Sequence, residues 1–381
     1  MLIGIDASRA TVARRTGTEL YSLRLIEALL ALDTSHRFRL YFNRPPAADL
    51  FSIDDRVERR IIPFPRLWTH LRLGLEVATR PPDVLFVPSH VLPLFTRPPA
   101  VVTVHDLGYL HFPQAHPPRQ RRYLNWSTRH NARTARVVIA DSEATRGDLV
   151  ARYGVPAGKI VVAYPGPEPD LAPVSDAQAI AAVKRRCGIQ GDYFLHMGTL
   201  QPRKNLARLI QAFADLLAAA PQSNVQLVLA GKKGWLYGDL FRQARRLELE
   251  GRVLFPGYVD EVDKAALLSG ALAYVLPSLY EGFGFPALEA QVCDTPLISA
   301  NTSSLPEVAG DAALLVDPLD VDELAGAMGR LLNDVGLRAD LVSRGRRNRA
   351  RFSWRACAET VMAALETVLT TDCTDYTEGL V

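Results

Sequence analysis

Two glutamates stand at the ends of a short glycine-rich segment, EGFGFPALE, which begins at Glu281 and ends at Glu289. The apolar run before it is typical of a buried strand, Gly282 and Gly284 allow a tight turn, and Pro286 suits the first position of a helix. A turn that leads from a strand into a helix directs backbone N–H groups and the positive end of the helix dipole toward a ligand. The segment therefore predicts a site for a phosphate or a diphosphate.

The two carboxylates would take different places around such an anion. Glu281 would lie in the loop, and Glu289 in the first helical turn, about one turn after Phe285, where it can accept hydrogen bonds from hydroxyl groups. A plainer interpretation is open for each residue. Acidic side chains are common in first helical turns because they complement the dipole, and Glu281 could be a solvated turn residue.

A second polar cluster, in the segment GTLQPRKN, follows the strand predicted at residues 193–197. This segment lacks the G-K-[S/T] ending of a P-loop. Arg203 and Lys204 stand at a helix start, where the dipole disfavours cations, so an anionic ligand shared with the Gly284 turn would explain them. A surface basic pair is the alternative.

His105 and Asp106 come directly after the strand predicted at residues 101–104. Ligands of parallel sheets lie beyond the carboxyl ends of the strands, so His105 is placed to touch a substrate. Asp106 could orient the imidazole or cap the segment that follows. A hydrogen-bonded core histidine is the alternative for His105.

Two further motifs are predicted to be structural. Ser304 and Glu307 have the spacing of a capping box. Asp320 and Asp322 form the only D-x-D in the chain, and because they open an apolar-periodic helix we expect an N-cap and first turn, and no metal site.

The elements around these residues indicate an α/β protein with two domains. Short apolar strands alternate with helices in both halves of the chain, which predicts mostly parallel sheets covered on both faces. The proline-rich stretch AYPGPEPDLAP is typical of an interdomain linker. We expect an N-terminal domain over 1–166, a C-terminal domain over 167–353, an amphipathic helix over 354–370 and a flexible tail over 371–381.

Length and composition limit the class of protein. The 381 residues are 48% hydrophobic, enough for two or three independently stable domains. No apolar run approaches the roughly 18 residues of a membrane span, and Asp6 and Arg9 stand where a signal peptide needs an apolar core. We therefore expect a cytoplasmic protein that could be peripheral to a membrane. The 4 cysteines form no C-x-x-C pair, so neither a zinc site nor a disulfide framework is indicated.

The net charge of +3 hides a difference between the two halves. Residues 1–166 contain 23 Lys and Arg against 14 Asp and Glu, a net charge of +9, and the remainder carries 21 against 27, or −6. Two basic segments of the first half stand out: in 63–80, apolar residues share one helical face beside Trp68, and in 118–136, arginines recur at helical spacing with Trp126. They suit an anionic membrane or a lipid-linked acceptor. Solvated faces over ordinary core are the alternative, and nucleic acid is a weaker one because no recognition motif accompanies the arginines.

The E-x7-E spacing of the two glutamates resembles the signature of retaining glycosyltransferases of family 4, in the GT-B superfamily. The likeness extends over nearly the whole chain. Matching segments are MGTLQPRKN at 197–205, LVLAGKKGW at 227–235, FPGYVDEVDKAALLSGA at 255–271 and NTSSLPEVAGDAALLVDP at 301–318. The last of these, with VHDLGYLHFP at 104–113, looks most like the branch that contains O-antigen mannosyltransferases.

The resemblance implies a GT-B fold, with two Rossmann-like, doubly wound domains that face each other across a cleft and a C-terminal helix that crosses back to the N-terminal domain. It implies a nucleotide-sugar site on the C-terminal domain and an acceptor site on the N-terminal one. Catalytic roles are carried over to His105, which would contact the transferred sugar, and to Glu281. Substrate-binding roles are carried over to Gly17, Asp106, Arg203, Lys204, Val259, Phe283, Gly284, Phe285, Leu288 and Glu289.

Within that set, the resemblance gives the diphosphate to Lys204, the nucleotide base to the backbone of Val259 and the ribose to Glu289. Many relatives have a Gly-Gly pair where this chain has Thr16-Gly17, and an arginine where it has Thr199, so Arg203 is the expected second cation.

The implied reaction moves a hexose from a nucleotide diphosphate sugar, with GDP-mannose as the first choice, to a hydroxyl of a growing cell-surface glycan, with retention. Protein cations and the helix N-terminus would stabilise the departing diphosphate, so no metal or other cofactor is expected. Three other classes stay open: a sugar-nucleotide epimerase of the same fold, a non-catalytic protein that binds a sugar nucleotide, and a nucleic-acid-binding protein.

Overall fold

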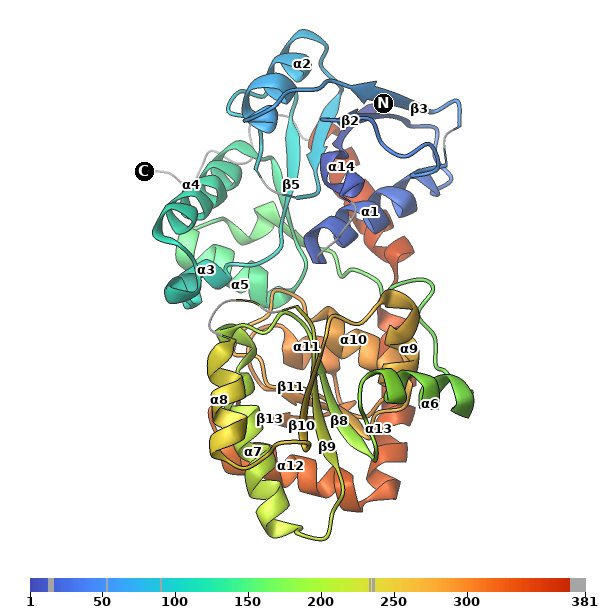
Figure 1. Cartoon of the computed structure of the whole chain (residues 1–381). Coiled ribbons are helices and arrows are strands. Elements are labelled where there is room, and N and C mark those ends of the chain that lie inside the picture. The colour runs from blue at the N-terminus through green and yellow to red at the C-terminus, as the bar shows by residue number, and fades with distance from the viewer. Residues whose placement is uncertain (13–16, 53, 90, 233, 235–236, 371–381) are drawn as a thin grey trace. The chain divides into compact units, whose positions relative to one another are not determined.

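A computed structural model describes residues 1–12, 17–52, 54–89, 91–232, 234 and 237–370 of the chain (Figure 1). The chain divides into two compact units. The first comprises residues 1–166 together with the segment that begins at Phe352, and the second comprises Pro167–Arg351. The tail over 371–381 lies outside the described residues, so its predicted flexibility stays a prediction.

A seven-stranded parallel sheet forms the centre of the first unit, with the strand order β3-β2-β1-β4-β5-β6-β7. Its strands are β1 (Leu2–Asp6), β2 (Arg37–Phe42), β3 (Val57–Ile61), β4 (Val84–Val87), β5 (Ala100–Val104), β6 (Val137–Ala140) and β7 (Ile160–Val162). Alternate residues of one strand enter two separate cores: Val84 and Phe86 belong to one, and Leu85 to the other. Both faces of the sheet are therefore covered, which is why its central strands are continuous apolar runs.

The helices of the first unit are α1 (Gly17–Leu30), α2 (Gly74–Thr79), α3 (Gly108–His111), α4 (Pro118–Thr134), α5 (Glu143–Tyr153) and α14 (Trp354–Thr370), with short turns η1 (Ser8–Thr11), η2 (Trp68–Leu73), η3 (Pro113–Ala115) and η4 (Ala157–Lys159). The last helix, α14, packs against the first, α1. Val361 and Leu365 of α14 share one core with Leu25 and Ile26 of α1. The C-terminal helix thus completes the N-terminal unit, across the whole intervening sequence.

The second unit holds a six-stranded parallel sheet in the order β10-β9-β8-β11-β12-β13. Its strands are β8 (Tyr193–Met197), β9 (Gln226–Ala230), β10 (Val253–Gly257), β11 (Ala273–Leu276), β12 (Leu297–Ala300) and β13 (Ala313–Val316). Its helices and turns are α6 (Ala177–Arg186), η5 (Pro202–Lys204), α7 (Leu206–Ala219), α8 (Gly238–Arg246), α9 (Glu261–Ser269), α10 (Phe285–Val292), α11 (Leu305–Ala309), α12 (Val321–Asn333), α13 (Val335–Asn348) and η6 (Arg349–Arg351). The predicted N-cap of α12 is confirmed, because Asp320 Oδ1 accepts a hydrogen bond of 2.9 Å from the backbone N–H of Glu323.

The strand order reverses once in each sheet. The reversal lies between β1 and β4 in the first unit and between β8 and β11 in the second. In open parallel sheets the crossover helices leave such a point in opposite directions, so the carboxyl ends of the two strands flank a crevice that is the usual ligand site. Ligand sites are therefore expected at the loops after β1, β4, β8 and β11.

The segment over 66–79 differs in part from its sequence-based interpretation. Leu67, Leu71 and Leu75 are exposed, as a surface face requires, but Trp68 is buried and its Nε1 donates a hydrogen bond of 2.7 Å to the carbonyl of Ile62. A tryptophan buries a large apolar area once its N–H has a partner, so Trp68 anchors this segment to its own unit. Within the described parts of the chain, every helix is too short or too polar to cross a bilayer.

The loops at the carboxyl ends of β8 and β9 approach each other closely. Gly231 has φ of +141°, and a Cβ atom built on it would lie 1.8 Å from the carbonyl oxygen of Gly198. Glycine is therefore required at position 231, because both the backbone conformation and the space exclude a side chain.

We expect Gly231→Ala to destabilise the protein by on the order of 3 kcal/mol, since the added methyl overlaps backbone that cannot rotate away. Gly326→Ala is the matched control. Gly326 lies inside α12 with open space around it, so the same substitution there should stabilise by about 0.5–1 kcal/mol. Thermal or urea unfolding of the two variants measures both effects, and equal stability of the two would contradict the steric argument.

Candidate functional site

The crevice between β8 and β11 brings together three charged residues that the sequence singled out. Lys204 ends the turn η5 after β8, and Glu281 lies in the loop after β11. Lys204 Nζ lies 2.6 Å from Glu281 Oε1, and Arg203 Nη1 lies 2.8 Å from Glu281 Oε2. Lys204 and Glu281 are each only 7% exposed. Residues 77 positions apart thus form one buried cluster because β8 and β11 are neighbours.

The charge of Glu281 is fixed by its two partners. Burial by itself would raise the pKa of this carboxyl, but Lys204 and Arg203 hold it well below its usual range. For Lys204 the direction is opposite, because burial disfavours the charged amine and lowers its pKa, while Glu281 opposes that effect. Glu281 is therefore ionised at neutral pH, with both of its oxygens bound to cations.

The helix α10 opens beside this cluster, as the glycine-rich segment predicts. Gly284 is its N-cap residue with φ of +103°, and no side chain caps the helix there. Arg203, Lys204 and the N-terminus of α10 are three positive groups around one loop, and together they can bind an anion that competes with Glu281. A diphosphate has the charge and the number of acceptor oxygens for that exchange.

Two serines hold the loop that carries Glu281. Ser304 Oγ lies 2.9 Å from the carbonyl oxygen of Glu281 and 2.8 Å from that of Phe283, and Ser303 Oγ accepts a hydrogen bond from the Glu281 N–H. The capping box expected at Ser304 and Glu307 is wrong. Ser304 makes no side-chain cap of α11, because its hydroxyl is used across the crevice loop instead.

Glu289 lies about one turn after Phe285, as expected, but as the fifth residue of α10 it begins the second turn and does not lie in the first. Its Oε1 lies 2.6 Å from Nζ of Lys264, a residue of α9 that the sequence analysis did not select. Burial disfavours the charged form of Lys264, but Glu289 outweighs it and raises the pKa of that lysine. Lys264 also stands three residues after Glu261, so in the sequence it has the spacing of an ordinary surface helix pair.

The other predicted residues of the second unit are Val259, Phe283, Phe285 and Leu288, and the first three lie in or beside the loops at this edge of the sheet. Val259 lies in the loop between β10 and α9. The rings of Phe283 and Phe285 meet edge to face, with centroids 5.1 Å apart. Leu288 has no exposed surface, which argues against a contact between its side chain and a ligand.

In the first unit, His105 lies at the carboxyl end of β5 and both of its ring nitrogens have partners. Nδ1 lies 2.6 Å from Oδ2 of Asp141, and Nε2 lies 3.0 Å from the carbonyl oxygen of Pro88. Asp106 does not orient the imidazole. Its Oδ1 instead accepts a hydrogen bond from the Gly108 N–H and so caps the next turn, which was the other possibility.

Two further elements place His105. Thr145 of α5 donates a hydrogen bond of 3.2 Å to the His105 carbonyl, and the buried ring of Tyr21 meets the imidazole edge to face at 4.7 Å. Tyr21 lies one turn into α1, whose first residue is Gly17. The part of the glycine loop before Gly17 lies outside the described residues. Sequence reasoning missed Asp141 because an aspartate after a strand has no distinguishing spacing to a histidine 36 residues earlier.

A second histidine, His196, lies completely buried near Lys204. Its Nδ1 donates a hydrogen bond of 2.9 Å to the carbonyl of Val275, and Nε2 has no partner among the described residues. Nδ1 must carry the proton because a carbonyl only accepts. Burial, with a contribution from Lys204, lowers the pKa of His196 to about 4. The imidazole of His196, near Lys204, is therefore neutral.

His196 should make the second unit sensitive to acid. Unfolded histidine takes up a proton near pH 6.5 and the folded residue only near pH 4, so stability falls as the pH drops between these values, by up to about 3 kcal/mol. In His196→Gln this loss should be smaller. Melting temperatures of both proteins between pH 7 and pH 4 test it, and identical slopes would show that His196 does not titrate in this way.

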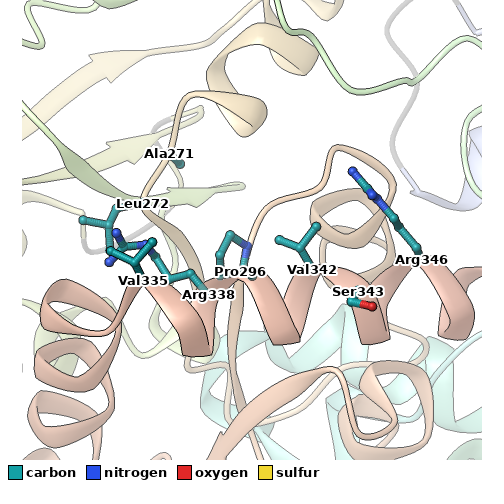
Figure 2. Close-up of a pocket in the computed structure, with 9 residues that line it drawn as sticks. Ala271, Leu272, Pro296, Val335, Arg338, Val342, Ser343 and Arg346 are labelled. Carbon is teal, nitrogen blue, oxygen red and sulfur yellow. The ribbon is translucent and has the colours of Figure 1, made fainter.

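A shallow pocket also lies on the second unit, away from these residues. Figure 2 shows Arg338, Val342 and Arg346 of α13 beside Leu272 and Pro296. Leu272 and Pro296 immediately precede β11 and β12, so the pocket lies at the amino ends of the strands, opposite the loops that carry Lys204 and Glu281. It is not part of the candidate site.

Comparison with known protein families matches both units. Residues 15–171 match the model of Glycosyltransferase Family 4, and residues 188–348 match that of Glycosyl transferases group 1. The two parallel sheets, each with one strand reversal, have the GT-B fold.

One relative and two solved structures illustrate the likeness. The chain is 34% identical over 258 residues to O-antigen chain mannosyltransferase B of Escherichia coli, covering 68% of each protein. Sucrose-phosphate synthase of Thermosynechococcus elongatus has a TM-score of 0.76 at 21% identity, covering 97% of this chain and 100% of that one. Anabaena HepE in complex with UDP and glucose has a TM-score of 0.73 at 20% identity, covering 96% and 99%. This chain belongs to the group 1 glycosyl transferases and is a glycosyltransferase.

Proposed function

We propose that the enzyme transfers mannose from GDP-mannose to a hydroxyl of a growing cell-surface glycan, with retention of configuration. The observation that carries the proposal is the buried cluster of Lys204, Arg203 and Glu281 beside the N-terminus of α10. Mannose is the sugar named for the O-antigen relative, and the same chemistry would serve another hexose on another nucleotide.

In the proposed reaction, the donor diphosphate binds Lys204, Arg203 and the backbone N–H groups at the start of α10. These groups stabilise the charge that develops on the leaving diphosphate, so the protein supplies the cations and no metal is part of the proposal. Glu289, paired with Lys264, would hold the ribose, and Val259 would offer backbone to the base. His105 of the first unit would contact the transferred sugar.

Retention is proposed to follow from attack on the face that the leaving group departs from. Both oxygens of Glu281 already accept hydrogen bonds from cations, which lowers the basicity of the carboxylate and disfavours it as a covalent nucleophile. Glu281 is better suited to orient the sugar once the diphosphate has taken over part of the cationic cluster.

Lys204→Ala should weaken donor binding and turnover together, because it removes the main cation from the leaving group and leaves Glu281 buried with less compensation. We expect kcat/KM to fall by roughly 100-fold or more. Lys184→Ala, on α6 of the same unit, is the matched control and should behave as wild type.

Thermal stabilisation by GDP-mannose, UDP-glucose, UDP-N-acetylglucosamine and UDP-galactose identifies the donor, since ligand at many times its dissociation constant adds a few kcal/mol. Release of nucleoside diphosphate that depends on a glycan acceptor then separates transfer from epimerisation and from binding alone. Wild-type activity in Lys204→Ala would remove the diphosphate assignment.

We further propose that the first unit contacts an anionic membrane that carries the lipid-linked acceptor. His70, next to the exposed leucines, contacts Tyr123 and Trp126 of α4, and Phe95 lies beside Gly74 of α2. We propose that these segments contribute to one apolar surface that also carries arginines. Its exposed apolar members are Phe64, Leu67, Leu71, Leu75, Leu94, Phe95, Tyr123 and Trp126, and its arginines are Arg66, Arg119 and Arg122.

This surface has the chemistry of an interfacial membrane site. Exposed leucines and aromatic rings bury into the headgroup boundary, and arginines bind anionic headgroups. The nearby acid, Glu76, is buried and pairs with Arg60 and Arg72, so it does not oppose an anionic surface.

The double variant Leu71→Glu, Leu75→Glu should bind vesicles that contain phosphatidylglycerol at least tenfold more weakly, because it puts negative charge in place of exposed apolar area that would insert into the headgroup boundary. Val335→Glu, at an exposed apolar position of the second unit, is the control. Co-sedimentation with anionic and with neutral vesicles measures the effect. Unchanged sedimentation of the double variant would show that the membrane contact lies elsewhere.

A further inference from the structure

The imidazole of His105 and the carboxyl of Asp141 share a proton in an enclosed setting. The carbonyl of Pro88 accepts from Nε2, so Nε2 carries one proton. A separation of 2.6 Å between Nδ1 and Asp141 Oδ2 requires a second proton between them. Whichever atom holds that proton, the pair has no net charge.

The surroundings keep the pair together. Burial lowers the pKa of His105, but Asp141 outweighs it and leaves that pKa raised. Burial raises the pKa of Asp141, and His105 opposes it. The groups that face the pair from other elements are Asp106 after β5, the Tyr21 ring of α1 and the Cys357 thiol of α14.

We infer that Asp141 is a positioning residue that fixes the ring of His105 and holds the additional proton, so that the imidazole beside the sugar belongs to a charge-neutral pair. This inference rests on the proposed contact between His105 and the transferred sugar. Glycosyl transfer passes through a state in which the sugar ring gains positive charge. An imidazolium without a counter-ion would oppose that charge, and the carboxylate of Asp141 cancels it.

Nothing in the fold would otherwise require an acid at position 141. Asp141 is 2% exposed, and its second oxygen, Oδ1, has no donor among the described residues. A buried carboxyl with one unmatched oxygen costs stability, so its presence fits a role toward His105 better than one in folding.

Asp141→Asn tests the inference, because asparagine keeps the shape and removes the shared proton. His105, assigned by comparison with His105→Ala, should titrate at lower pH in Asp141→Asn than in wild type when followed by NMR of the imidazole. The high-pH limb of the kcat/KM profile should also move to lower pH. Near pH 7.5, kcat should fall about tenfold or more.

Asp148→Asn is the matched control. Asp148 Oδ2 lies 2.9 Å from His111 Nε2 in the same unit, so this variant breaks a second histidine–carboxylate pair and should leave the pH profile unchanged. In the His105→Ala background, Asp141→Asn should cost no further activity, whereas a purely structural role would still lower activity and melting temperature there.

The NMR titration needs no substrate, so it separates this inference from the proposed function. A His105 titration that does not move in a folded Asp141→Asn variant overturns the inference even if mannose transfer is found. A titration that moves in a protein without transferase activity supports the Asp141–His105 pairing and refutes the proposed function alone.

Discussion

The ion cluster of Lys204, Arg203 and Glu281 sets the constraint on which the second unit depends. A carboxylate buried at the edge of a sheet is costly, and removal of one partner would leave an uncompensated charge. The cluster holds only if η5 and the loop after β11 meet, which requires β8 and β11 to be neighbours at the strand reversal. Close approach of the Gly198 and Gly231 loops and the two serines after β12 keep that edge of the sheet in shape.

The same cluster links structure to reaction. Without a donor, Glu281 neutralises the cations that a diphosphate would bind, so the crevice is formed in advance and its positive groups are not left unpaired. Exchange of one anion for another costs less reorganisation than assembly of a new site, which is the general advantage of a preorganised electrostatic environment. Glu289 of α10 with Lys264 of α9 repeats this arrangement.

The candidate site residues of the first unit form a pair without net charge, His105 and Asp141, whereas those of the second unit form a cluster of charged groups. His105 and Asp141 come from adjacent strands, β5 and β6, and their separation is set by a register in which Val104 pairs with Ala140. The imidazole of His105 meets the ring of Tyr21 of α1 edge to face, and Tyr21 in turn packs against Trp354 of α14. The C-terminal helix therefore supports the residue proposed to touch the sugar, through one intermediate aromatic ring.

The sequence by itself determined the alternating β/α architecture and the turn and helix around Gly284, because these depend on local spacing and apolar periodicity. It made Arg203, Lys204, Glu281 and His105 candidates by their places after strands, and the resemblance to family 4 favoured them over the plainer interpretations. The edge strands β7 and β13 were not predicted, since they are short and mostly half-buried and so lack the continuous apolar run of a central strand. Only the tertiary structure decided the partners. Lys264 for Glu289, Asp141 for His105 and Ser304 for the crevice loop join elements far apart in the chain, and strand order places them, which periodicity does not encode. The burial of Trp68 was decided in the same way, because its hydrogen bond to Ile62 exists only once the segment after β3 has folded onto its unit.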